Sequence, residues 1–467
     1  MRRLSRVVAI SLFAFGAHLA IGCSDDSTGP DKNPAPSPGT HIWSMRFGDY
    51  GGQYARDLAV DASGNVFIAG NFNGTIDFGG GPLTSNGMLW DIYVAKFGPD
   101  GSHIWSKSFG DDKQQFVRSI AVDPSGNAII TGAFLGSINF GGGALTSTTP
   151  SFEDVFVAKF GPGGSHIWSK KFGDANPQFG TAVAADPWGN IFVTGDFQGS
   201  ISFGGDPFVS DGGSDIFVAK LTPGGVHRWS KHYGNPYDQY SRAIAADGAG
   251  NVFVGGVFID AIDFGCGTIG YSSGRGICVA KLDSAGVCSW SDGFGASGDQ
   301  ELEEIAVDAS GNSIIAGSFD VSVDFGGGTL TSAGNQDIFV AKFGPGGAHL
   351  WSKRFGDTNV QNGYGVAADA SGNTVITGIL YGTADFGGGA LTSAGNGDVF
   401  IAKFGPGGNH LWSKRFGDAR YQYAFGLGTD ASGNVLAAGG FLGSIAFGGD
   451  TLTSTTDDDV FVVKLGP

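Results

Sequence analysis

A tryptophan recurs seven times along this chain, each time in the same local sequence. Consecutive copies lie 61 to 63 residues apart, and they are Trp43, Trp105, Trp168, Trp229, Trp290, Trp351 and Trp412. A fixed period of this length indicates that one supersecondary unit is repeated along the chain. We therefore predict that residues 40–467 consist of seven copies of one structural unit.

Each unit contains four short apolar segments separated by turn-forming residues. In the first complete unit they predict strands a, b, c and d at residues 58–60, 66–69, 91–96 and 103–107. The a–b and c–d connections are rich in Asp, Gly and Asn, which form tight turns. The chain has 84 glycines yet is 12% aromatic, so its glycines belong to β-turns rather than to a low-complexity segment. Four antiparallel strands in a meander form one blade of a β-propeller.

The two ends of the repeat region each carry part of a blade. The region opens with a lone strand d at residues 41–47 and stops after a lone strand c at residues 459–465. Pairing these strands completes the last blade and removes two open sheet edges. The sequence therefore predicts an all-β fold, a seven-bladed β-propeller of four-stranded antiparallel blades, closed by its N-terminal strand. The segment between strands b and c, such as residues 321–332, forms either a small extra hairpin or an ordered loop, and we favour the loop.

The repeated motifs resemble those of a known family. Within residues 41–467 the units carry Asp-x-Ser-Gly-Asn-Val-Phe-x-x-Gly, then Asp-Val-Phe-Val-Ala-Lys, then Gly-x-His-x-Trp-Ser-Lys. Together these motifs resemble the SBBP β-propeller repeat of bacterial envelope proteins, and their layout is similar to that of NHL repeats. The resemblance implies a propeller on an exported bacterial protein and no particular biochemical activity.

The first 39 residues predict export and anchoring. Three arginines followed by an apolar run are typical of a signal peptide, which we assign to residues 1–22. The run ends in Ala-Ile-Gly-Cys, which resembles the lipobox of bacterial lipoproteins and implies cleavage before Cys23 and lipidation of its thiol. Ordinary signal-peptide cleavage beside an incidental cysteine is the alternative. Residues 23–39, rich in Pro, Ser and Asp, predict a disordered tether. We expect a lipid-anchored protein of the bacterial cell envelope, at the outer membrane or cell surface.

The charge of the chain limits its partners. The formal net charge is −17, and removing residues 1–22 takes away three arginines and no acid, which leaves −20. Such an acidic protein is poorly suited to bind nucleic acids or anionic membrane surfaces. We expect a monomer without a cofactor, whose partner is an envelope or extracellular protein or a glycan.

Three polar positions recur in nearly every unit. Each a–b turn begins with an aspartate and has an asparagine four residues later, as in Asp61 and Asn65. A catalytic group is needed once, so a sevenfold aspartate indicates a cap of its own turn. Calcium is the alternative, but the alternating acids of an EF-hand loop are missing. A histidine two residues before six of the tryptophans is interpreted as a packing residue, and we predict no metal site.

A glutamine follows every repeated tryptophan ten residues later. The seven glutamines either form an amide ring at the mouth of the central channel or tie loops together, and we favour the second reading. They are Gln53, Gln115, Gln178, Gln239, Gln300, Gln361 and Gln422.

The fourth unit carries three cysteines where the other units have Gly, an aromatic residue and His. In an exported protein they predict a disulfide between two of the three, with one thiol left over. The sequence does not decide the pair among Cys266, Cys278 and Cys288.

The two faces of the predicted ring differ in how much the units vary. The a–b and c–d turns on one face are nearly uniform, whereas the d–a and b–c connections on the other face vary. Variable loops on a rigid scaffold are where binding is expected. The predicted binding face therefore includes Arg56, Trp90, Arg118, Arg242, Glu303, Tyr364 and Phe425.

One cluster of glutamates raises the question of catalysis. Glu301, Glu303 and Glu304 offer a general acid, but no matching base lies beside them in the sequence. We interpret the cluster as a solvated loop and predict a binding module rather than an enzyme. A structural envelope module without a specific ligand is the first alternative, and a propeller enzyme of the lyase or glycosidase type is the second.

Overall fold

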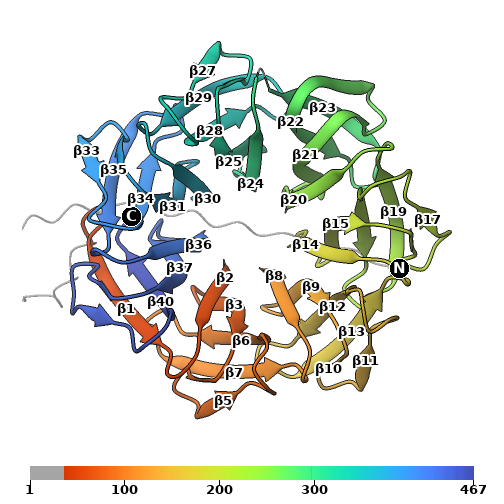
Figure 1. Cartoon of the computed structure of the whole chain (residues 1–467), viewed down its shortest axis with the longest axis horizontal. Coiled ribbons are helices and arrows are strands. Elements are labelled where there is room, and N and C mark those ends of the chain that lie inside the picture. The colour runs from red at the N-terminus through yellow and green to blue at the C-terminus, as the bar shows by residue number, and fades with distance from the viewer. Residues whose placement is uncertain (1–35, 296) are drawn as a thin grey trace, which may run out of the picture. The chain divides into compact units, whose positions relative to one another are not determined.

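The computed structural model describes residues 36–295 and 297–467, and every structural statement below concerns these residues. They form seven four-stranded antiparallel sheets arranged as the blades of a propeller around a common centre (Figure 1). None of the described elements is a helix, let alone one apolar and long enough to cross a membrane. The predicted all-β, seven-bladed fold is confirmed.

Each blade is a meander that runs outward from the centre, and we number the blades one to seven in chain order of their innermost strands. The innermost strands are β2 (Gln53–Val60), β8 (Gln115–Val122), β14 (Gln178–Ala185), β20 (Gln239–Ala246), β24 (Gln300–Val307), β30 (Gln361–Ala368) and β36 (Gln422–Thr429). The second strands are β3 (Val66–Phe72), β9 (Ala128–Phe134), β15 (Ile191–Phe197), β21 (Val252–Asp263), β25 (Ser313–Phe319), β31 (Thr374–Leu380) and β37 (Val435–Phe441). The third strands are β6 (Asp91–Phe97), β12 (Asp154–Phe160), β18 (Asp215–Leu221), β22 (Thr268–Leu282), β28 (Asp337–Phe343), β34 (Asp398–Phe404) and β40 (Asp459–Leu465). The outermost strands are β7 (His103–Phe109), β13 (His166–Phe172), β19 (His227–Tyr233), β23 (Cys288–Phe294), β29 (His349–Phe355), β35 (His410–Phe416) and β1 (His41–Phe47).

The last blade is closed by the first strand of the chain. β1 pairs antiparallel with β40, with Met45 opposite Val462. Arg46 of β1 lies 3.0 Å from the buried carboxylate of Asp459, and Phe47 is buried against blade one. The predicted closure is therefore confirmed, and the ring has no exposed edge at the junction of its ends.

The hydrophobic core lies between neighbouring blades. Every residue of β3 and β6 is buried, because both faces of each blade are covered by the adjacent blades. One cluster, for example, joins Phe67 of blade one to Phe156 of blade two. This explains why the middle strands read as continuous apolar runs rather than as alternating ones.

The segment between the second and third strands is a hairpin in six blades, so the prediction of a loop is wrong. The hairpins are β4–β5 (Thr75–Asp77, Pro82–Thr84), β10–β11 (Ser137–Asn139, Ala144–Thr146), β16–β17 (Ser200–Ile201, Phe208–Val209), β26–β27 (Ser322–Asp324, Thr329–Thr331), β32–β33 (Thr383–Asp385, Ala390–Thr392) and β38–β39 (Ser444–Ile445, Leu452–Thr453). In the first, the Asp77 carboxylate accepts hydrogen bonds from two glycine amides of the turn, and Phe78 is buried in the blade core. In blade four the same segment extends β21 and β22 instead.

A buried ion pair links each blade to the next, and in six blades a tryptophan hydrogen bond does so as well. In blade five, Lys342 Nζ lies 2.8 Å from Asp308 and donates a 2.9 Å hydrogen bond to the Gly372 carbonyl of blade six. Trp351 Nε1 donates to the Pro406 carbonyl of blade six at 2.9 Å. Each of the seven blades has the same Lys–Asp pair within 3.6 Å. These contacts give the repeated tryptophan and aspartate a structural role.

The cysteines of the fourth unit form one disulfide, between Cys266 and Cys288, whose Cα atoms are 5.7 Å apart. It joins the turn between β21 and β22 to the outermost strand of the same blade. Cys278 is a buried free thiol on β22. The predicted disulfide is therefore present, and its pairing comes from the structure.

Candidate functional site in the central channel

A β-bulge in every innermost strand turns one extra side chain toward the centre of the ring. In blade one the pairing with β3 passes from Ala55 directly to Asp57, so that Arg56 is the extra residue. A bulge re-aims the side chain that it carries. The seven bulged residues are Arg56, Arg118, Thr181, Arg242, Glu303, Tyr364 and Phe425.

Six of the seven residues assigned to the binding face are thus on strands, and their assignment to d–a loops is wrong. The innermost strands begin five residues earlier than predicted, at Gln53 rather than Leu58 in blade one. The bulge is the physical reason, because it interrupts the alternation of buried and exposed residues by which a strand is recognised. Trp90 does lie on a b–c connection, immediately before β6, where its ring packs 5.3 Å from that of Tyr54.

A glycine on the second strand allows each bulge. In blade five Gly317 pairs with Leu302, and a Cβ on Gly317 would collide with the carbonyl oxygen of Glu301. The equivalent glycines of the other blades face the same carbonyl, and they are Gly70, Gly132, Gly195, Gly256, Gly378 and Gly439. The bulges are therefore built into the repeat.

The bulged side chains surround one mouth of the central channel. A cavity of about 270 Å³ is lined there by Arg56, Arg118, Phe179, Thr181, Asp196, Tyr240, Ser241, Arg242 and Glu303. The two remaining bulged residues complete the ring, since the rings of Tyr364 and Phe425 are 4.8 Å apart and the Arg56 guanidinium lies 4.6 Å above Phe425. Strands from different blades therefore bring six predicted residues into one site, which we call the channel mouth.

Three guanidinium groups of the channel mouth are only partly neutralised. Arg242 donates a 3.2 Å bond to Glu301, which also pairs with Arg275 at 2.5 Å. Among the described residues, neither Arg56 nor Arg118 forms an ion pair with a carboxylate. Burial lowers the pKa of Arg118, and the positive charges of Arg56 and Arg242 lower it further. An anion placed between these groups would relieve their mutual repulsion.

The pKa values of the two acids of the channel mouth are raised. Burial raises the pKa of Asp196 to about 7, although Arg242 and Arg118 oppose the shift. Burial also raises the pKa of Glu303, against the opposing effect of Arg56 and Arg242. A carboxyl group that keeps its proton can donate one hydrogen bond and accept others. The channel mouth therefore offers cationic groups together with carboxyl groups that form hydrogen bonds.

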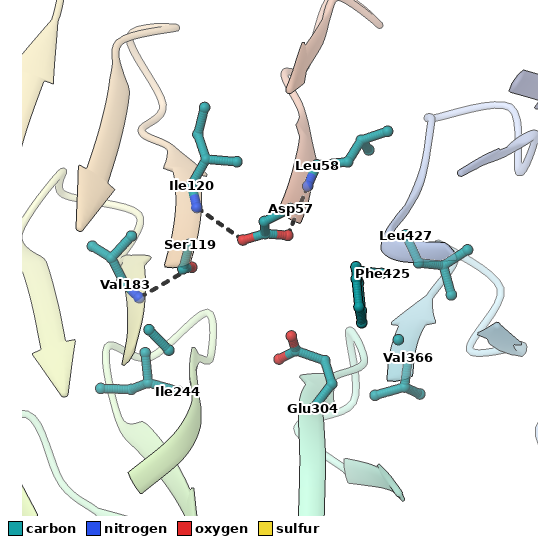
Figure 2. Close-up of a pocket in the computed structure, with 12 residues that line it drawn as sticks. Asp57, Leu58, Ser119, Ile120, Val183, Ile244, Glu304, Val366, Phe425 and Leu427 are labelled. Carbon is teal, nitrogen blue, oxygen red and sulfur yellow. Dashed lines mark hydrogen bonds between the residues drawn. The ribbon is translucent and has the colours of Figure 1, made fainter. Parts of the chain in front are cut away.

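A second cavity, of about 150 Å³, lies next along the channel. Aliphatic residues such as Leu58 and Ile120 line it, but its exposed surface is mainly polar, and the carboxyl groups of Asp57 and Glu304 point toward each other across it (Figure 2). The Asp57 carboxylate accepts bonds from the Leu58 amide at 2.7 Å and from the Ile120 amide of the next blade at 2.8 Å. The interpretation of the glutamates as a solvated loop is therefore wrong, because β24 places Glu303 and Glu304 inside the channel.

Both carboxyl groups of this second cavity have a raised pKa. Burial raises the pKa of Glu304 to about 8, and the negative charge of Asp57 adds to the shift. Burial raises the pKa of Asp57 to about 6, against the two amide hydrogen bonds that favour its ionised form. At neutral pH Glu304 is therefore mainly protonated and Asp57 mainly ionised. The sequence offered no base beside the glutamates, whereas the structure supplies Asp57 from another blade.

The seven glutamines that follow the repeated tryptophans are buried, and their side chains hydrogen-bond to loop residues, as in the reading that we favour. Gln361 Nε2 donates to Asp357 at 2.7 Å, and Gln361 Oε1 accepts from the Asp357 amide at 3.0 Å. Each of the seven side chains donates to a loop oxygen in this way. The glutamine amides are therefore engaged in the loops that lead into the innermost strands.

The aspartates of the a–b turns are engaged as well. Asp308 Oδ1 accepts from the Ser310 and Asn312 amides at 2.9 and 3.0 Å, while Oδ2 accepts from the Asn312 side chain and faces Lys342. The six histidines before the repeated tryptophans lie on separate outer strands, and each contacts a serine three residues later.

Seven closed blades, with charged side chains bulged into the channel, define the class of protein: it is a seven-bladed β-propeller repeat protein. No protein-family model matches the chain. An uncharacterized WD repeat-containing protein of Acanthamoeba polyphaga mimivirus is 22% identical to it over 504 residues, which cover 91% of this chain and 33% of that protein. The chain thus spans about a third of the length of this curated relative.

Several solved structures resemble the chain at low sequence identity. The WD40 β-propeller domain of Doa1 has a TM-score of 0.40 at 9% identity, covering 91% of this chain and 96% of that one. A Dyadobacter fermentans protein of unknown function has a TM-score of 0.41 at 11% identity, covering 91% and 98%. The β-propeller domain of the trilobed protease from Pyrococcus furiosus has a TM-score of 0.44 at 7% identity, covering 88% and 93%. The SBBP-type repeat and the lipoprotein signal stay predictions, and Cys23 lies outside the described residues.

Proposed function

We propose that this protein is an exported, lipid-anchored binding module whose channel mouth receives an acidic sugar residue of a glycan. The observation that carries the proposal is the convergence of three guanidinium groups, from Arg56, Arg118 and Arg242, on one cavity. Arginine binds carboxylates through paired, charge-assisted hydrogen bonds. The overall charge of −17 makes this cluster a local exception on an acidic protein.

The other groups of the channel mouth favour a sugar over a simple anion. Phe179 and Tyr240 give the cavity flat apolar walls, and Thr181 and Ser241 add hydroxyl groups. Asp196, with a pKa of about 7, provides both a donor and an acceptor for ligand hydroxyls. Small-molecule sites commonly combine apolar walls with a few converging polar groups. A sugar ring that bears one carboxylate matches this combination.

Export and anchoring rest on residues 1–39 rather than on the propeller. The arginine-initiated apolar run and the lipobox-like sequence before Cys23 support a lipid anchor in a bacterial envelope, with the tether holding the propeller away from the membrane. Metabolic labelling with a radioactive fatty acid tests this part: label on the wild type and none on Cys23→Ser is expected. Equal labelling of both chains, or none of either, would contradict the anchor.

The binding proposal is tested on a glycan array with the full chain, comparing the wild type with Arg118→Met and Lys113→Met. Lys113 is exposed on the loop that leads into β8, so the control removes the same charge outside the channel. We expect retention of uronic-acid glycans by the wild type and by Lys113→Met, and at least tenfold weaker retention by Arg118→Met. Folded wild type that retains no acidic glycan, or an Arg118→Met chain that binds equally well, would refute the proposal and favour a structural envelope module.

An enzyme is the second candidate, because Asp57 and Glu304 form a carboxyl pair at the centre of the channel. One protonated and one ionised carboxyl group are what glycoside hydrolysis requires. If the channel is catalytic, hydrolysis of a bound acidic glycan should be lost in Glu304→Gln while binding at the arginines persists. Binding without turnover in the wild type would remove this candidate.

A further inference from the structure

The first residue of the third strand is a buried aspartate in six of the seven blades. In four of these blades a basic residue of the outermost strand neutralises it. The pairs are Arg46–Asp459 at 3.0 Å, Lys171–Asp154 at 2.8 Å, Arg354–Asp337 and Arg415–Asp398. Four blades therefore hold one positive charge between the third and outermost strands, whereas blade one carries Ser108 at the basic position and leaves Asp91 without an ion pair among the described residues.

Blade three departs from this pattern at two positions. Its outermost strand carries His232 where the four blades carry Lys or Arg. Its b–c connection carries Asp211 where blade five carries Ala333, and hydrogen bonds establish the equivalence. The Asp211 amide donates to Asp215 Oδ2 at 3.0 Å, and the Ala333 amide donates to Asp337 Oδ2 at 2.8 Å. Blade three has thus exchanged a basic side chain for an imidazole and has gained a second carboxylate.

The three side chains converge on one point. One ligand atom from each of Asp211, Asp215 and His232 lies within 4.8 Å of the other two. Asp215 is fully buried, and among the described residues its Oδ1 has no hydrogen-bond partner, as is also true of Asp91, Asp154, Asp337 and Asp398 in the other blades. The imidazole ring is positioned by two aromatic neighbours, with centroids 4.8 Å from Phe208 and 6.3 Å from Phe197. Asp211 is exposed, which leaves an open path from solvent.

The donor set decides which cation fits. Two carboxylate oxygens and one imidazole nitrogen are ligands that Zn²⁺ accepts in tetrahedral sites, with water in the fourth position. Ca²⁺ and Mg²⁺ prefer six or more oxygen ligands, which this site does not provide.

We propose that blade three binds a divalent transition-metal ion, Zn²⁺ in preference to Ca²⁺ or Mg²⁺, through Asp211, Asp215 and His232. The ion occupies the position that the ammonium or guanidinium group occupies in blades two, five, six and seven. It joins the b–c connection to the outermost strand of the blade, on the same side of the ring as the channel mouth. The site is independent of the sugar-binding proposal, because it shares no residue with the channel mouth.

The test is calorimetric titration of the full chain with Zn²⁺ alone, on the wild type, His232→Arg and Asp211→Asn. His232→Arg restores the ion pair of the other blades, so this variant is expected to fold. Asp211 is exposed, so its substitution leaves the core unchanged and serves as a second variant. We expect the wild type to bind one more equivalent of Zn²⁺ than either variant, and to gain thermal stability with Zn²⁺ where the variants do not. Equal stoichiometry in all three chains would overturn the proposal.

Blade five provides a gain-of-site control. The double substitution Ala333→Asp with Arg354→His transfers the arrangement of blade three to an equivalent position. The double variant is expected to bind one further equivalent of Zn²⁺, and Co²⁺ bound at either site should give visible d–d absorption. If the wild type with Co²⁺ lacks this absorption and has the same spectrum as His232→Arg, the metal site is also refuted.

Discussion

The carboxyl pair at the centre of the channel makes the stability of the propeller depend on pH in an unusual direction. Buried acids of most proteins are ionised and lose their stabilising contacts in acid. The pKa of Glu304 is instead raised to about 8 by burial and by Asp57. The folded chain therefore holds a proton that the unfolded chain releases, and stability falls as pH rises from the unfolded pKa through the folded one.

The substitution Glu304→Gln removes this titration and preserves the shape of the neutral acid. A shift from 4.5 to about 8 corresponds to roughly 5 kcal/mol at full ionisation, since each pKa unit is worth about 1.4 kcal/mol. The side chain keeps some contact with water in the channel, so we expect about 2–4 kcal/mol. Between pH 5 and pH 9 the wild type should lose this amount of unfolding free energy relative to Glu304→Gln.

The assay is urea unfolding of the full chain at pH 5, 7 and 9. Glu153→Gln is the matched control, because Glu153 is the only glutamate outside β24. The control should follow the wild type at every pH, while Glu304→Gln should be the more stable chain at pH 9. A wild type and a Glu304→Gln chain that lose stability in parallel would refute the buried carboxyl pair.

Three further predictions concern the links that hold the ring together. Lys342→Met leaves Asp308 buried and unpaired, so the unfolding free energy should fall by about 3–5 kcal/mol in urea titrations; no change would show that the pair contributes nothing. Reduction of the Cys266–Cys288 bond, whose cysteines are 22 residues apart, should cost roughly 3 kcal/mol, measured with and without dithiothreitol. Deleting residues 41–47 removes the buried contacts of β1 and should lower stability by more than about 4 kcal/mol; a truncated chain that melts like the intact one would contradict ring closure.

The fold was predictable because the repeat determines it locally. The period of the tryptophans and the incomplete blades at the two ends are properties of the sequence alone. They were sufficient to predict the seven blades and the pairing of β1 with β40. The hairpin between the second and third strands was missed because its strands are only two or three residues long, too short to show alternation.

The sequence predicted which residues form the channel mouth, but it did not predict that they lie on strands. Arg56, Arg118 and Arg242 stood out because the units differ there, yet they were placed on loops. A signal for the bulge does exist: the buried residues Ala55 and Leu58 are separated by three positions rather than two. A spacing of three inside an otherwise alternating segment is the mark of an inserted residue.

Other features depend on distances across the ring and could not be found along the chain. Asp57 and Glu304 come from blades one and five, and only closure brings them together. The contact of His232 with Asp211 and Asp215 depends on the hydrogen-bonded register of β18 and β19. The pairing of Cys266 with Cys288, rather than with Cys278, depends likewise on register, because Cys288 lies opposite Leu282 whereas Cys278 lies opposite Gly293.

The most direct test of the account is a crystal structure of the full chain soaked with a glucuronate-terminated oligosaccharide. We predict that its carboxylate lies between the guanidinium groups of Arg56, Arg118 and Arg242, with the sugar ring beside Tyr240. Sugar bound at the b–c loops or the outer edges of the blades, or an empty channel mouth at saturating ligand, would contradict the central claim.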